Sequence, residues 1–138
     1  MFRKIFIFLF AIFISTNSTS KEIDKAYFGG GCFWCMEESF EKVDGVIEVI
    51  SGYSGGTTTN PTYKEVTYGD TGHFETVEII YDKSLTNFEE LLKIFWINVD
   101  PFDSQGQFCD KGYSYRSVAF YKNDLQKKQI MESLKKIE

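Results

Sequence analysis

Residues 26–42 read AYFGGGCFWCMEESFEK, which predicts a strand, a glycine turn and a helix in direct succession. The strand is expected at residues 26–28 and the helix at residues 35–42. Glycine has no Cβ, so three consecutive glycines let the backbone turn sharply and allow a substrate to approach closely. Cys32 is therefore expected at or next to a helix N-terminus, where unpaired N–H groups and the helix dipole favour a thiolate.

The two cysteines of this stretch, Cys32 and Cys35, have the spacing of a disulfide pair and favour redox or nucleophilic chemistry. A buried structural pair packed among aromatic rings is the first alternative. Half of a zinc site is the second, but the other ligands would then be Cys109 and the only histidine, His73, each far along the chain. The sequence thus predicts thiol chemistry without a metal or cofactor.

Residues 1–20 have the order of a secretory signal peptide. Arg3 and Lys4 precede an apolar run at residues 5–14, and small polar residues follow up to Ser20. The run is about half of the roughly twenty residues that a membrane-spanning helix needs. We expect cleavage near Ser20, export to the periplasm or the medium, and no stable membrane association of the mature protein.

Residues 21–138 suffice for one compact domain, which we expect to be a monomer. The net charge of the full chain is −5, and loss of Arg3 and Lys4 with the signal brings it to −7. An acidic surface without basic clusters argues against a nucleic-acid partner. In an oxidising compartment a working Cys-x-x-Cys pair also needs a dedicated reductant.

Beyond the cysteine pair, strands and helices alternate. Strands are expected at residues 46–53, 74–81 and 117–121, with loops at residues 54–62 and 103–115. Strands that alternate with helices predict an α/β sandwich, in which helices pack on a small mixed sheet.

The most clearly patterned helix begins after Thr86, which is expected to form a capping box with Glu89. Its apolar residues recur on one face, as expected of a core-facing helix: Phe88, Leu91, Leu92, Phe95, Trp96 and Val99. A last amphipathic helix is expected at residues 124–137.

Seven short motifs follow one another between residues 31 and 117. They are GCFWC (31–35), GYSGG (52–56), NPTYKEV (60–66), GDTGHFE (69–75), DP (100–101), GQFCD (106–110) and YRS (115–117). Any one alone is weak evidence, but the ordered set resembles the A-type peptide methionine sulfoxide reductases. The resemblance implies a ferredoxin-like αβ core and reduction of the S epimer of methionine sulfoxide, free or in proteins.

The resemblance also implies roles for two groups. Cys32 is the nucleophile that attacks the sulfoxide sulfur, and Glu75 is the acid that protonates the departing oxygen. A carboxyl among aromatic side chains is expected to have a raised pKa, because desolvation disfavours its charged form. From the residues alone, Glu75 reads as a solvated side chain at a strand edge. The neighbouring His73 is expected to be structural.

The substrate site is assigned by the same resemblance. Phe33 and Trp34 are expected to hold the substrate methyl group, since sulfur and its methyl pack well on aromatic rings. Three further residues are expected to orient the sulfoxide oxygen and the acid through hydrogen bonds: Tyr63, Asp110 and Tyr115.

The implied cycle leaves a sulfenic acid on Cys32, which a second thiol converts to a disulfide for a thioredoxin-like reductant to reset. Many family members have glycine at the position of Cys35 and use a distant C-terminal cysteine. Here Cys35 is expected to resolve the sulfenic acid, with Cys109 as the alternative. The family usually continues past Glu138 through a segment with acidic, His and Tyr residues. Since every motif residue above is present, we expect activity in this shorter sequence.

Two other functions stay open at the level of sequence. A thioredoxin-like thiol–disulfide exchanger would use Cys32 and Cys35 and need no Glu75, although only Pro61 and Pro101 could supply the proline that faces the redox pair in that class. An inactive module that binds methionine in the aromatic pocket is the second.

Overall fold

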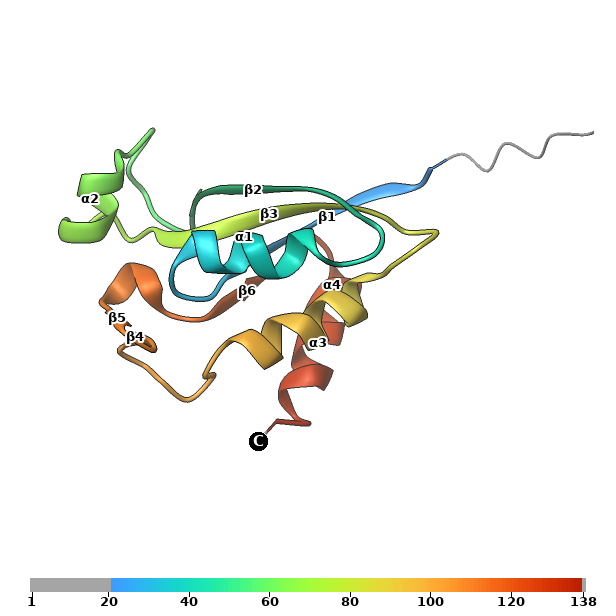
Figure 1. The fold of residues 1–138 in the computed structure, drawn as a ribbon. Helices are drawn as coiled ribbons and strands as arrows, with labels where there is room; N and C mark the ends of the chain where they lie inside the picture. The colour runs from blue at the N-terminus through green and yellow to red at the C-terminus, as the bar shows by residue number, and fades with distance from the viewer. Residues whose placement is uncertain (1–20, 138) are drawn as a thin grey trace, which may run out of the picture.

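The computed structural model describes residues 21–137, so the predicted signal peptide lies outside the described residues. Its main sheet has four strands in the order β2-β3-β1-β6 (Figure 1). These strands are β1 (Ile23–Gly29), β2 (Val46–Ser54), β3 (Phe74–Asp82) and β6 (Val118–Phe120). Between residues 21 and 137, no helix is long and apolar enough to span a membrane.

The order of elements is that of a ferredoxin-like fold, as the resemblance implies. Helix α1 (Phe33–Glu41) joins β1 to β2, and α3 (Phe88–Asn98) lies between β3 and β6. The expected mixed sheet is wrong, because every strand pairing in the described part of this sheet is antiparallel. The reason is that β3 lies between β1 and β2, antiparallel to both, so the strands joined by α1 are not neighbours.

Helices α1 and α3 pack against each other and against the sheet, and α4 (Asp124–Leu134) packs on α3. Phe28 on β1 is fully buried at the centre of this core. The rings of Phe40, Phe88 and Phe95 have their centroids 4.9–5.7 Å from the centroid of Phe28. The apolar stripe of α3 faces this core as predicted, with Trp96 at its edge.

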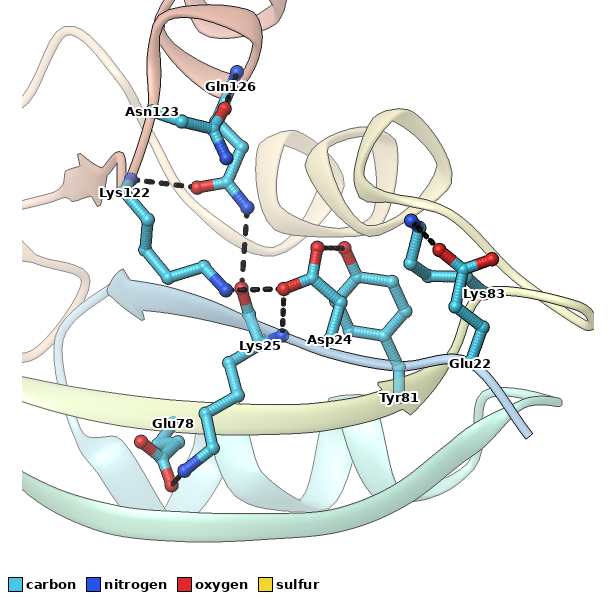
Figure 2. A network of polar contacts seen from close by, with 9 residues as sticks. All are labelled: Glu22, Asp24, Lys25, Glu78, Tyr81, Lys83, Lys122, Asn123 and Gln126. Carbon is cyan, nitrogen blue, oxygen red and sulfur yellow. Dashed lines mark hydrogen bonds and ion pairs between the residues drawn. The ribbon is translucent and has the colours of Figure 1, made fainter. Parts of the chain in front are cut away.

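A polar network fastens the N-terminal half of β1 to its neighbours (Figure 2). Asp24 pairs with Lys122 and accepts a hydrogen bond from the Tyr81 hydroxyl at 3.3 Å. Lys25 forms an ion pair with Glu78 at 2.7 Å. These contacts hold one end of β1 in place, while its other end leads through the glycines to Cys32.

The start of α3 differs from the prediction by one residue. Its N-cap is Asn87, whose side chain accepts a hydrogen bond from the Glu90 N–H at 3.0 Å. The predicted capping box of Thr86 with Glu89 is therefore wrong. Thr86 is instead buried in the preceding turn, where its N–H donates to the Asp82 carbonyl at 3.0 Å.

Several short elements lie in stretches without a predicted helix or strand. Helix α2 (Tyr63–Tyr68) begins with a capping box of Thr62 and Glu65. The expected loop at residues 103–115 contains a hairpin of β4 (Gly106–Gln107) and β5 (Asp110–Lys111), followed by the 3-10 helix η1 (Tyr113–Tyr115). The last predicted helix ends earlier, at Leu134 in α4.

Replacing Phe28 with alanine should lower the free energy of unfolding by about 3–5 kcal/mol, because the change removes buried ring contacts and leaves a cavity. Chemical denaturation followed by circular dichroism measures the change. Phe102, which is 71% exposed, provides the control, and Phe102→Ala should change stability by less than about 0.5 kcal/mol. Equal, small effects of the two variants would contradict the central place of Phe28 in the core.

Candidate active site

Cys32 is the N-cap residue of α1, in agreement with the sequence analysis. Its side chain is half-buried, and its carbonyl accepts hydrogen bonds from Cys35 N–H at 3.1 Å and Met36 N–H at 3.2 Å. The preceding Gly31 has φ +86°, and a Cβ there would lie 2.7 Å from the Cβ of Gln107. Glycine is thus required both by the backbone conformation and by the close approach of the β4–β5 hairpin.

Glu75 lies on β3 beneath the start of α1, and it is 1% exposed. Its Oε2 accepts a hydrogen bond from the Phe33 N–H at 3.1 Å, whereas its buried Oε1 has no hydrogen-bond partner. Burial is the largest influence on the pKa of Glu75 and raises it. The Phe33 N–H and the Tyr115 hydroxyl lower this pKa, whereas the negative charge of Asp110 raises it. A raised pKa and a free oxygen both favour a carboxyl as a proton donor.

Aromatic rings from three elements form a wall beside Cys32. Phe33 is buried at its centre, with ring centroids 5.2 Å from Trp34, 5.7 Å from Tyr53 and 6.2 Å from Tyr63. Trp34 stacks on Tyr63 at 6.1 Å and is 62% exposed. The structure therefore brings the predicted pocket residues of α1 together with the first residue of α2, and leaves the indole open to a ligand.

The Tyr115 phenol from η1 lies close both to the Glu75 carboxyl and to the Tyr63 hydroxyl. Burial raises the pKa of Tyr115 first, and the Tyr63 hydroxyl and the negative charge of Glu75 raise it further. Its phenol therefore keeps its proton and stays a hydrogen-bond donor. Of the three residues predicted to orient the oxygen and the acid, Asp110 acts on Glu75 through its charge, and Tyr63 and Tyr115 lie close to one another.

Tyr53 is a site residue that the sequence analysis missed. It lies directly opposite Glu75 in the pairing of β2 with β3, so both side chains point to the same face of the sheet. Burial raises the pKa of Tyr53, and Glu75 and Tyr63 add to the rise. Its place in the GYSGG motif, on the core-facing positions of β2, was the available signal.

A pocket of about 240 Å³ opens on the other side of Cys32, between α1, the end of α3 and the β4–β5 hairpin. Cys35 and Asp110 line it together with Cys32. Partial burial of its sulfur raises the pKa of Cys35, and the adjacent Cys32 thiol, Asp110 and Glu38 raise it further. Cys109 is exposed in the hairpin turn and does not line this pocket.

His73 has the structural place predicted for it. Its Nδ1 accepts a hydrogen bond from the Gly56 N–H at 3.1 Å, and its Nε2 lies 2.9 Å from the Thr58 carbonyl oxygen. The imidazole thus fixes the loop between β2 and α2. Among residues 21–137, no group of three or more His, Cys, Asp and Glu side chains is placed to hold a metal ion.

Residues 24–138 match the family model described as peptide methionine sulfoxide reductase. The chain belongs to this family. It is 50% identical over 117 residues to the peptide methionine sulfoxide reductase MsrA of Listeria innocua, covering 85% of this chain and 66% of that protein. It is 51% identical over 112 residues to MsrA of Bacillus licheniformis, and the match covers 81% of this chain and 62% of that protein. The chain therefore spans less than two thirds of the length of these peptide methionine sulfoxide reductases.

Solved structures confirm the family fold. Methionine sulfoxide reductase A of Corynebacterium diphtheriae superposes with a TM-score of 0.75 at 31% identity, covering 83% of this chain and 57% of that one. Reduced Mxr1 from Saccharomyces cerevisiae also gives a TM-score of 0.75, at 28% identity, covering 83% and 67%. The motif-based resemblance to peptide methionine sulfoxide reductases is thus confirmed.

The raised pKa of Glu75 predicts a stability difference that depends on pH. The folded protein binds this proton more tightly than the unfolded chain, so the contribution to stability is complete below the unfolded pKa of about 4.3 and is lost as pH rises through the folded pKa. Glu75→Gln removes the titration. Its stability relative to the unaltered protein should therefore rise as pH increases from the unfolded pKa through the raised folded pKa of Glu75.

Urea denaturation at several pH values measures this difference. Glu48→Gln, at an exposed carboxyl on β2, controls for the loss of one negative charge. A stability of Glu75→Gln relative to the unaltered protein that stays constant or falls as pH rises would contradict a raised pKa of Glu75.

Proposed function

We propose that this chain reduces the S epimer of methionine sulfoxide, free or in proteins, to methionine, a repair reaction for oxidised methionine. The main support is the buried Glu75 carboxyl with its unpaired Oε1, held under the helix start that presents Cys32. Membership of the peptide methionine sulfoxide reductase family supports the same reaction.

Substrate would enter on the aromatic side of Cys32. The methyl group would pack on Phe33 and Trp34, since methyl–sulfur groups pack well on aromatic rings. The sulfoxide oxygen would then face Glu75, with the Tyr115 phenol close to that carboxyl and the Tyr63 phenol close to Tyr115. These donors are held by β3, α2 and η1, so they need little reorganisation as charge develops on the oxygen.

The chemical step transfers one oxygen atom. The Cys32 thiolate attacks the sulfoxide sulfur while Glu75 gives its proton to the oxygen. The transient bond between Cys32 Sγ and the substrate sulfur and the substrate S–O bond then break as the oxygen passes to Cys32 as a sulfenic acid, and methionine leaves with the two electrons that the thiolate supplied. The Cys35 thiol then attacks the Cys32 sulfur, the hydroxyl leaves as water, and a disulfide joins the two cysteines. Cys35 is the resolving residue because it lies beside Cys32 in one pocket.

A thiol–disulfide exchanger is the second candidate function, supported by the Cys-x-x-Cys spacing. It would leave the buried Glu75 and the neighbouring phenols without a role, although burying a carboxyl is costly. An inactive methionine-binding module would likewise need no proton donor at this position. The reductase uses all of these groups.

We also propose that the protein is exported. Support comes from the order of charged, apolar and small polar residues at positions 1–20, which lie outside the described residues. Fractionation of the producing cells, with mass spectrometry of the purified N-terminus, tests this. A mature chain that begins near Lys21 in the exported fraction is expected, and an intact Met1 in the cytoplasm would contradict it.

The purified chain with dithiothreitol should release methionine from the S sulfoxide and leave the R epimer unchanged. Cys32→Ser should abolish the release, since Cys32 at the N-cap of α1 is the nucleophile of the proposed step. Glu75→Gln should lower kcat by about 10²–10⁴, the usual worth of general acid catalysis. Chromatography of the amino-acid products of each epimer measures all three.

Tyr68→Phe is the control, because Tyr68 is 81% exposed at the end of α2; its kcat should equal that of the unaltered protein. Equal turnover of both epimers, or full activity in Glu75→Gln, would contradict the proposed chemistry.

Cys35→Ser should stop the cycle at the sulfenic acid. After one turnover without reductant, dimedone should label Cys32 in this variant, whereas the unaltered protein should form a Cys32–Cys35 disulfide. Peptide mass spectrometry distinguishes the two products. Cys109→Ser should behave as the unaltered protein, and a dimedone adduct in Cys109→Ser alone would assign resolution to Cys109 instead.

A further inference from the structure

Cys32 borders two surfaces, and the sulfoxide is proposed to bind at only one of them. The aromatic wall is built from α1, β2 and α2, whereas the second pocket is built from α1, the end of α3 and the β4–β5 hairpin. Figure 1 shows both elements beyond the N-terminal end of α1, with α2 above and the hairpin below the level of that end. We call the second pocket the Cys35 groove; it includes Cys35, Ser39, Ile97, Asn98, Phe108 and Asp110.

The Cys35 groove has two apolar side chains with large exposed fractions. Ile97 on α3 is 81% exposed and Phe108 in the hairpin turn is 67% exposed. Asn98 accepts a hydrogen bond from the Ser39 hydroxyl at 3.2 Å, which fixes the end of α3 against α1. Both apolar groups thus border the same groove as the exposed Cys35 thiol.

The exposure of Phe108 is built into the hairpin. Phe108 has φ +49°, a left-handed conformation that is uncommon for a large side chain. The adjacent Gln107 is 1% exposed and clamps the hairpin to Asp100, accepting from its N–H at 2.6 Å and donating to its carbonyl at 2.8 Å. The left-handed turn and the hydrogen bonds of Gln107 thus hold the hairpin with the Phe108 ring exposed beside the groove.

We propose that the Cys35 groove is the docking surface for a protein dithiol reductant, which binds the exposed Ile97 and Phe108 and attacks the Cys35 sulfur. The inference rests on the proposed function, because it needs the Cys32–Cys35 disulfide as its electrophile. A partner of this chemistry fits because the groove combines an exposed reactive sulfur with apolar contacts, and Asp110 is its only charged lining residue.

The exchange is balanced in two steps. A thiolate of the partner forms a bond to Cys35 Sγ, the Cys32–Cys35 bond breaks, and Cys32 leaves as a thiolate at its helix N-terminus. The partner's second thiolate then attacks its own first sulfur, and Cys35 leaves and takes a proton from water. The partner is oxidised to a disulfide by two electrons, and both cysteines of this chain are reduced.

Attack on Cys35 rather than Cys32 agrees with two observations. Cys35 is exposed, whereas Cys32 is half-buried. Partial burial of its sulfur, together with the neighbouring Cys32 thiol and the carboxylates of Asp110 and Glu38, raises the pKa of Cys35. A higher pKa makes Cys35 the poorer leaving group. The sulfoxide and the reductant can then use opposite sides of Cys32 in turn.

The test compares two reductants on the full chain. Ile97→Ser, Phe108→Ser and the double variant are assayed for reduction of methionine S-sulfoxide with dithiothreitol and, separately, with purified thioredoxin recycled by thioredoxin reductase and NADPH. The double variant should raise the KM for thioredoxin about tenfold, as expected for loss of interface anchors, and leave the rate with dithiothreitol unchanged. Leu125→Ser, at a 64% exposed residue of α4, is the control and should change neither.

A thioredoxin variant that lacks its second cysteine should in addition be trapped as a mixed disulfide on Cys35, located by peptide mass spectrometry. An unchanged thioredoxin KM in the double variant, or trapping on Cys32 or Cys109, would overturn the docking surface. Loss of activity with dithiothreitol in the unaltered chain would instead overturn the proposed function.

Discussion

The hydrogen bond from the Phe33 N–H to the Glu75 carboxyl, buried where β3 passes beneath the start of α1, is the contact on which the site depends. It places an acid from one strand under a helix that begins at another strand's end. The ferredoxin-like order makes this possible, because β3 lies directly beside β1 in the sheet. The close glycine turn before Cys32 then sets the thiol above the acid. Burial, rather than a partner charge, is the largest cause of the raised pKa of Glu75.

The N-terminal end of α1 divides the surroundings of Cys32 into two sides with different chemistry. Aromatic rings and phenols lie toward β2, α2 and η1, close to the buried acid. Cys35 lies toward α3 and the hairpin, among exposed apolar side chains and beside Asp110. A reaction that first oxidises Cys32 and then resets it needs two partners in succession. The two sides allow the sulfoxide and the reductant to reach the surroundings of Cys32 from different directions.

The long elements and the core were predictable because their periodicity is a direct consequence of burial, as the apolar stripe of α3 shows. Short elements were not, because α2 has only six residues inside a polar stretch, and a Thr-x-x-Glu pattern alone does not separate the capping box at Thr62–Glu65 from the similar residues at Thr86–Glu89, which form none. Glu75 looked like a surface residue, because alternation along one strand does not reveal what covers it. Only the family motifs assigned it a role. Tyr53 escaped notice because strand register, which sets it opposite Glu75, is a tertiary property.

The most direct test of the account is the titration of Glu75 itself, followed by carboxyl ¹³C NMR with Glu75→Gln to assign the resonance. The account predicts a midpoint above the ordinary value for glutamate, about 4.3, because burial disfavours the charged carboxylate. A second substitution, Asp110→Asn, should move the midpoint down by removing a negative charge that raises it. A midpoint at or below the ordinary value would show that the carboxyl is charged when Cys32 reacts, and would contradict its role as the proton donor.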